Sequence, residues 1–138
     1  MSPKDFFWGV ATSAYQVEGA VGADGRTPNA WDRFAAAGNS PVYRGDVASV
    51  SADHYHHLAA DLDLVAGLGV NAYRFSLSWT RLLTRGTGPV NAKGASFYDR
   101  MIDGVLARGI TPMVTMCHND LPADLMDDGG WECRTTAD

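Results

Sequence analysis

One structural unit occurs twice along this chain, and the repeat restricts the choice of fold more than any other feature. Apolar residues at helical spacing precede Gly69 and again precede Gly109, which lies 40 positions later. Each glycine is followed by one apolar residue and then a strand-like segment, Ala72 to Trp79 in the first copy and Met113 to Cys117 in the second. Such units predict an α/β fold with parallel strands connected by helices. The apolar positions are Tyr55, Leu58, Leu62 and Val65 in the first helix and Phe97, Met101 and Val105 in the second.

A further strand is predicted near the amino terminus, from Phe7 to Thr12. The stretch from Gly22 to Ser51 is rich in Gly, Pro, Asn and Asp, and it is expected to form a long loop with one short helix from Trp31 to Ala37. Asn91 is well placed to cap the second repeated helix. Because folds of this kind keep their sites at the carboxyl ends of the strands, the polar residues that follow the strands are the candidates for a functional site.

The composition fits a single globular domain and disfavours two classes of partner. Hydrophobic residues make up 46% of the 138-residue chain, charged residues make up 20%, and the net charge is −5. An acidic chain is a poor match for nucleic acid or for an anionic membrane. No stretch approaches the roughly 20 apolar residues that a membrane helix needs. The sequence starts without an apolar leader, so we expect a cytoplasmic protein.

The histidines near position 55 do not predict a metal site. His54, His56 and His57 follow Asp53, but their spacing divides them between helix faces and supplies no fourth ligand. The two cysteines of the chain have no metal-ligand spacing either. We therefore expect no metal.

Several segments together carry a family resemblance. They are Phe7 to Gly19, Tyr73 to Trp79, and Val90 to Gly94 with the following Phe97 and Tyr98. In order and spacing they resemble the amino-terminal portion of the family 1 glycoside hydrolases, the β-glucosidase type. The resemblance implies that residues 1–138 are the first three strand–helix units of a (β/α)8 TIM barrel, ending before the fourth strand. A closed barrel needs eight strands and about 250 residues, so this domain is expected to be incomplete.

The resemblance also implies which residues bind a substrate. Gln16 matches a glutamine that holds hydroxyls of the non-reducing-end sugar, and a side-chain amide, with one acceptor and two donors, suits vicinal hydroxyls. His118 matches a histidine that donates to a sugar hydroxyl. Asn119 stands where the family usually has tryptophan, between that histidine and Asp120. The implied partner is a small β-glycoside, and no cofactor is implied.

Arg74 is a special case among the site candidates. The resemblance implies that it contacts the nucleophilic carboxylate of the family and helps to hold it ionised. This chain has no such carboxylate. An arginine in an apolar strand must be paired, because an isolated buried charge is costly. We therefore expect a structural ion pair between Arg74 and Asp120, the only acid at a strand end nearby.

The catalytic residues of the family are not expected in this chain. Retaining glycosidases need two carboxylates about 5–5.5 Å apart, and the family supplies both as glutamates from its fourth and seventh strands. The only glutamates here are Glu18 and Glu132, and neither stands in such a context. The chain by itself is thus expected to be an inactive piece of a retaining β-glycosidase of carbohydrate metabolism.

Two alternatives stay open on the sequence alone. One is a non-catalytic fragment or pseudoenzyme that binds at most a sugar or a partner. The other is a fragment of a 6-phospho-β-glycosidase, whose phosphate-holding residues would lie further along the chain. In every case the third strand, Met113 to Cys117, leaves an open sheet edge, and we expect the chain to associate through it.

Overall fold

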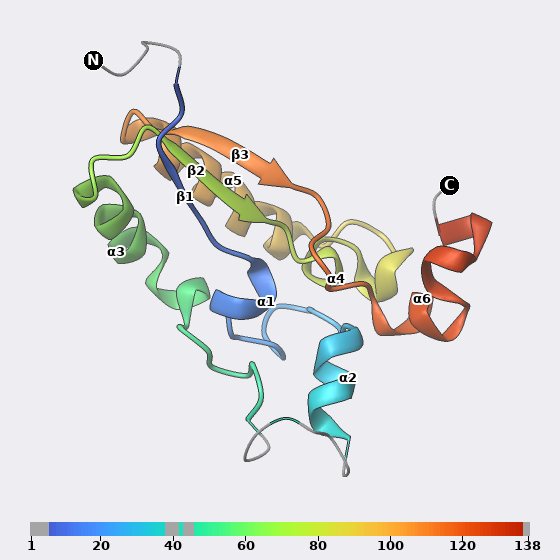
Figure 1. Cartoon of the computed structure of the whole chain (residues 1–138). Coiled ribbons are helices and arrows are strands. Elements are labelled where there is room, and N and C mark those ends of the chain that lie inside the picture. The colour runs from blue at the N-terminus through green and yellow to red at the C-terminus, as the bar shows by residue number, and fades with distance from the viewer. Residues whose placement is uncertain (1–5, 38–41, 43–45, 137–138) are drawn as a thin grey trace.

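The computed structural model describes residues 6–37, 42 and 46–136. Its centre is a sheet of three parallel strands in the order β1-β2-β3 (Figure 1), as the repeated unit predicted. The strands are β1 (Gly9–Ala11), β2 (Ala72–Ser76) and β3 (Thr111–Thr115). The middle strand β2 is paired on both sides, whereas β3 has a described neighbour on one side only.

Two long helices connect the strands, and shorter ones follow the strand ends. The helix α3 (His54–Gly67) leads into β2, and α5 (Ala92–Ala107) leads into β3. Most of the remaining helices and turns lie beyond the arrowheads of the strands in Figure 1. They are α1 (Ala14–Val17), α2 (Ala30–Ala36), α4 (Trp79–Leu82), α6 (Ala123–Asp127) and the 3-10 turns η2 (Thr84–Gly86), η3 (Gly130–Glu132) and η4 (Arg134–Thr136). None of the described helices is long and apolar enough to cross a membrane.

The two glycines of the repeat end their helices as predicted. Gly69 has φ +72° and Gly109 has φ +70°, the left-handed conformation that glycine adopts without steric cost. A Cβ atom at either position would meet nothing within 4 Å, so the backbone conformation, and not close packing, favours glycine there. The side chain of Asn91 accepts a hydrogen bond from the Lys93 amide, which confirms it as the cap of α5.

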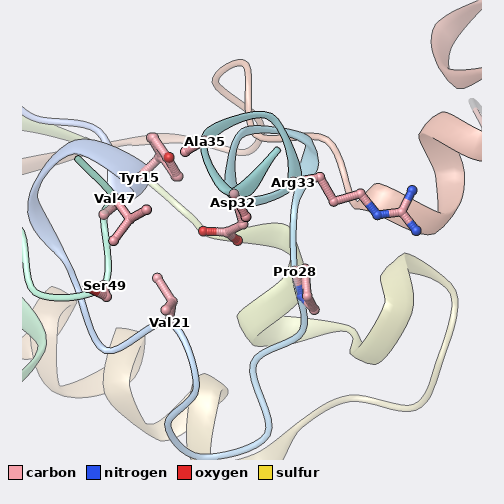
Figure 2. Close-up of a pocket in the computed structure, with 10 residues that line it drawn as sticks. Tyr15, Val21, Pro28, Asp32, Arg33, Ala35, Val47 and Ser49 are labelled. Carbon is pink, nitrogen blue, oxygen red and sulfur yellow. The ribbon is translucent and has the colours of Figure 1, made fainter. Parts of the chain in front are cut away.

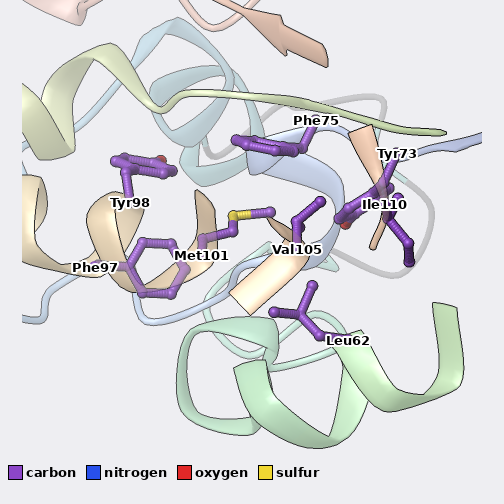
Figure 3. Close-up of a cluster of buried hydrophobic side chains, with 8 residues drawn as sticks. All are labelled: Leu62, Tyr73, Phe75, Phe97, Tyr98, Met101, Val105 and Ile110. Atoms are coloured by element: carbon purple, nitrogen blue, oxygen red, sulfur yellow. The ribbon is translucent and has the colours of Figure 1, made fainter. Parts of the chain in front are cut away.

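One face of the sheet packs on both long helices. Leu62 of α3 and Val105 of α5 meet Tyr73 and Phe75 of β2 there, each at most 2% exposed. Figure 3 shows the whole cluster between the sheet and the helices. Its members are Leu62, Tyr73, Phe75, Phe97, Tyr98, Met101, Val105 and Ile110. Because side chains alternate along a strand, Arg74 points to the opposite, open face of the sheet.

The third strand lies two residues earlier than predicted, and Pro112 explains the difference. Proline has no N–H group to donate, so it fits inside a strand only where no neighbouring strand needs that bond. In the structure the Thr111 N–H donates to Asn71 O, and Thr115 O accepts from the Leu77 N–H. In this alternating ladder the missing N–H of Pro112 falls on the open edge, the side of a sheet where proline is tolerated. Pro112 therefore lies inside β3 without breaking a bond to β2.

The other two strands are shorter than predicted. Strand β2 ends at Ser76 because the Ser78 N–H leaves the sheet and donates to the hydroxyl of Tyr98 on α5, at 2.6 Å. The regular part of β1 covers Gly9–Ala11, although Trp8 O and the Thr12 N–H still bond to the segment of β2. The predicted helix in the long first loop is confirmed as α2, and residues 38–41 and 43–45 of that loop lie outside the described residues.

Candidate substrate-binding site

A hollow of about 250 Å³ lies beyond the carboxyl ends of β1 and β3. The segment around α1 contributes one wall and the loop after β3 contributes another. The three predicted binding residues Gln16, His118 and Asn119 all line it, although Gln16 and His118 are about one hundred positions apart in sequence. The remaining lining residues are Ser13, Tyr15 and Trp31. The structure therefore brings together the residues that the sequence assigned to sugar binding, while their roles stay a prediction.

Gln16 is oriented by a neighbour on its own helical turn. The Ser13 hydroxyl donates to Oε1 of Gln16 at 2.7 Å. This contact engages the amide oxygen and leaves the Nε2 group of Gln16 exposed at the hollow as a donor of two hydrogens. Sequence reasoning did not single out Ser13, although its spacing of three residues from Gln16 at the start of a helix was a usable signal.

The loop after β3 is shaped by Asp120. This residue is 1% exposed, and its Oδ1 accepts a hydrogen bond from the His118 N–H at 3.3 Å. Between the two, Asn119 has φ +67°, a left-handed conformation that asparagine tolerates better than most residues. The turn exposes the Asn119 side chain and leaves His118 half-buried at the hollow.

The environment of Asp120 changes its acidity. Its Oδ2 is buried and has no hydrogen-bond partner among the described residues. Burial penalises the charged form and raises the pKa of the Asp120 carboxyl to about 6, against an ordinary value of 3.8. The sequence marked Asp120 as a strand-end acid but gave no sign that it would be buried beneath the site.

Arg74 does not pair with Asp120, so that expectation was wrong. Its Nε donates to Oγ1 of Thr115 at 2.8 Å, on the open face of the sheet, and its side chain is exposed. The exposed guanidinium needs no acidic partner, because the described helices pack on the other face of the sheet. Arg74 also lies outside the lining of the hollow, so the structure does not bring it together with Gln16 and His118.

Aromatic rings border the hollow on the side of α2. The ring centroids of Tyr15 and Trp31 are 6.1 Å apart, and Trp31 meets Phe34 edge to face at 5.6 Å. Faces of this kind suit the C–H surface of a sugar ring. Trp79 has a different role, because its indole N–H donates to Gly86 O at 2.9 Å and anchors a loop.

Two other hollows lie next to the site and have fewer polar side chains that could bind a sugar. One, of about 300 Å³, shares Tyr15 with the site but is bordered mainly by apolar side chains such as Val21 and Val47 (Figure 2). Its acid, Asp32, is already engaged with Arg26 at 2.7 Å. The other, of about 480 Å³, shares Trp31 and Asn119 with the site. Its remaining lining residues are Ala30, Phe34, Leu121, Met126 and Trp131.

The histidines near position 55, for which the sequence predicted no metal site, each contact an acidic residue of the same segment. His54 Nδ1 lies 2.6 Å from Oδ2 of Asp61, and His56 Nδ1 lies 2.6 Å from Oδ1 of Asp53. His57 also contacts Asp53. Among the described residues, no group of three potential ligands is arranged to hold a metal ion.

Comparisons with known proteins agree with each other. The sequence model of glycosyl hydrolase family 1 matches residues 1–138. The chain is 50% identical to a beta-glucosidase of Agrobacterium sp. (strain ATCC 21400) over 98% of its own length and 29% of that protein. It is also 50% identical to beta-glucosidase A of Thermotoga maritima, over 99% of this chain and 30% of that one.

Solved structures show the same relation in three dimensions. A family 1 β-glucosidase from Thermotoga maritima superposes with a TM-score of 0.92 at 49% identity, covering 99% of this chain and 30% of that one. The virulence factor SghA, solved in complex with its substrate analog salicin, superposes with a TM-score of 0.91 at 49% identity over the same shares. The chain thus spans about 30% of the length of each of these relatives.

Proposed function

The chain belongs to glycosyl hydrolase family 1, and from that premise we propose that it supplies the sugar-holding part of a retaining β-glycosidase acting on small β-glucosides. Its fold is the amino-terminal portion of the family's TIM barrel, with three parallel strands and their helices. One observation carries the proposal: Gln16, His118 and Asn119 meet at one hollow at the carboxyl ends of the strands.

The chemistry of the hollow supports a sugar as its occupant. The Nε2 group of Gln16, the ring of His118 and the amide of Asn119 offer donors and acceptors to neighbouring hydroxyls. Tyr15 and Trp31 offer ring faces to the apolar side of a pyranose. The relatives are named as β-glucosidases, which favours a plain glucoside over a phosphorylated one.

The same proposal assigns no catalysis to these 138 residues alone. Glu18 is 4% exposed and is engaged with Arg81 at 2.9 Å, so it is not free to act as an acid or a nucleophile. Glu132 lies in η3 and is exposed, outside the lining of the hollow. Retention needs a pair of carboxylates flanking the scissile bond, and the hollow has none among its lining residues.

Binding is tested with two histidine variants. Calorimetric titration of the chain with deoxynojirimycin should show saturable binding, and His118→Ala should weaken it by about tenfold, the loss expected for one hydrogen bond in a polar site. The matched control is His56→Ala, an exposed histidine on α3, which should leave the affinity unchanged. Equal losses in both variants, or no binding to the unmodified chain, would contradict the proposal.

Catalysis is tested separately with an aryl β-glucoside. The purified chain should not release the aglycone above the rate in buffer, since the hollow has neither an acid/base nor a nucleophile. Turnover that survives repurification and disappears in Glu18→Gln would show that Glu18 is catalytic, contrary to the proposal.

A further inference from the structure

Three elements meet at one buried carboxylate beneath the site. Oε2 of Glu18 accepts from Nε of Arg81 at 2.9 Å, and Oε1 of Glu18 accepts from the hydroxyl of Tyr98 at 2.5 Å. Glu18 directly follows α1, Arg81 belongs to α4, and Tyr98 belongs to α5. All three side chains are buried, and Arg81 is not exposed at all. The hydrophobic cluster of Figure 3 includes Tyr98, so the network is attached to the core.

Each partner of Glu18 is itself fixed by a second contact. The Tyr98 hydroxyl accepts from the Ser78 N–H at 2.6 Å. Burial, and then the charge of Glu18, raises the pKa of Tyr98 well above its ordinary value, so this hydroxyl keeps the proton that it donates. The guanidinium of Arg81 lies 4.1 Å above the ring of Tyr55, and its Nη2 donates to Gly19 O at 3.2 Å.

The segment held in this way is the one that carries Gln16. Helix α1 has only four residues, which is too short to be stable by its own hydrogen bonds. Its amino-terminal end is bonded through the Ala14 N–H to Oγ of Ser76 at 2.8 Å. Its carboxyl-terminal end is bonded through the side chain of Glu18. The backbone there also accepts two hydrogen bonds, one at Glu18 O from the Tyr55 N–H at 3.1 Å and one at Gln16 O from the Ser51 hydroxyl. The position of Gln16, two residues before Glu18, is therefore fixed at both ends of the segment, and the side chain of Glu18 is the contact that connects it to the core.

Stability alone is a weak reason for such a network. A buried ion pair is often no more stabilising than apolar residues of similar volume, because both charges lose their hydration. Here Nη1 of Arg81 is also buried without a hydrogen-bond partner among the described residues, which adds a cost. What a directional network does supply, and an apolar contact does not, is one fixed geometry between the loops after β1 and β2.

We propose that Glu18, Arg81 and Tyr98 form a positioning network that holds Gln16 in register with His118 across the hollow. The network does not touch the sugar; it acts through the backbone of α1. This inference rests on the proposed function for its effect on binding, but its effect on α1 is independent of any ligand.

The test measures local order and binding in the same variants of the full chain. In Glu18→Gln and in Tyr98→Phe, hydrogen exchange of amides 13–19 should become faster by about tenfold or more, with much smaller changes in β2. Affinity for deoxynojirimycin should fall by about tenfold in both. Asp63→Asn is the matched control, because it removes the charge of an exposed acid that pairs with Arg108 and should change neither measurement.

Three outcomes would overturn the proposal. In the first, exchange of amides 13–19 is unchanged in both variants. In the second, exchange rises equally in β2, which would make the network merely stabilising. In the third, the unmodified chain already exchanges amides 13–19 at the rate of a free peptide. This outcome can be measured even if neither variant folds. If the unmodified chain fails to bind the probe, the proposed function fails, and the exchange data alone decide on the network.

Discussion

Strands β2 and β3 come from two copies of one sequence unit, yet their surroundings differ. In β2 all residues except Arg74 are buried, and Tyr73 and Phe75 are each 1% exposed. In β3 no residue is fully buried, and Val114, which pairs with Phe75 in the ladder, is 43% exposed. The local sequence pattern of helix, glycine and strand thus determines that a strand forms. Neighbours on both sides determine whether it is buried.

The contrast between the strands extends to the site. Gln16 stands on a segment connected to β2 through Ser76 and to the core through Glu18 and Tyr98. His118 and Asn119 stand at the end of the edge strand, where the loop is supported by the buried carboxylate of Asp120 and by backbone hydrogen bonds that join Leu121 and Ala123 to the segment that leads into α2. One side of the hollow is therefore attached to the core beneath the sheet, and the other is attached to the segment that leads into α2.

The largest expected effect separates the two strands directly. Phe75→Ala should lower the free energy of unfolding by about 3–5 kcal/mol, the range for removing a buried aromatic ring. Its ladder partner is the matched control, and Val114→Ala should cost less than about 1 kcal/mol because Val114 is half exposed. Urea unfolding followed by circular dichroism measures both. Similar losses would show that β3 is covered in solution.

The next effect concerns the acid that supports the edge-strand side of the site. Asp120 has a pKa of about 6 in the folded chain and an ordinary value of 3.8 when exposed. Between these values the folded state binds the proton more tightly than the unfolded state, so stability falls as the pH rises. Above pH 6 the full cost is roughly 3 kcal/mol.

The variant Asp120→Asn isolates this contribution. It keeps an acceptor for the His118 N–H and does not ionise. Relative to the unmodified chain, its stability advantage should grow from pH 4 to pH 6 and then level off, as measured by urea unfolding at each pH. An advantage that is constant with pH would show that Asp120 is not the group that titrates.

How much of the molecule could be predicted from the sequence depends on whether a feature arises from residues near in sequence or from residues far apart. The helices, the glycine caps and the parallel order of the strands were predictable, because each depends on residues near in sequence such as Gly69, Asn91 and Gly109. The meeting of Gln16 with His118 followed from the rule that parallel strands end at one edge. The predicted pair of Arg74 with Asp120 was wrong because side chains alternate along a strand, which puts Arg74 on the open face. The Glu18 network could not be predicted because its members are up to 80 positions apart in the sequence.

A smaller effect tests whether the open edge of β3 acts in solution. The chain should associate with increasing concentration, and Val114→Lys should weaken association by about tenfold, because a charge on an edge strand opposes pairing. Sedimentation velocity over a range of concentrations measures this. Leu64→Lys, at a residue 70% exposed on α3, should leave association unchanged. A monomer at all concentrations with a sharp thermal transition would show that the edge is not adhesive.

The smallest effect concerns Asn119. Its backbone conformation favours asparagine or glycine, whereas sugar binding favours a larger side chain at this position. Its φ of +67° costs most residues about 1–2 kcal/mol and asparagine less. Asn119→Trp should therefore lower the free energy of unfolding by about 1 kcal/mol, whereas Asn119→Gly, which accepts this φ, should be within about 0.5 kcal/mol of the unmodified chain.

Binding should follow the side chain and not the backbone. An indole at position 119 would add a ring wall and keep an N–H donor, so Asn119→Trp should bind deoxynojirimycin about tenfold more tightly. Asn119→Gly loses the donor and should bind more weakly, although its backbone is relaxed. Calorimetric titration of both variants separates the two contributions. If Asn119→Trp binds no better than the unmodified chain, then the asparagine belongs to a hollow shaped for a different sugar, and the shorter side chain is what selects it.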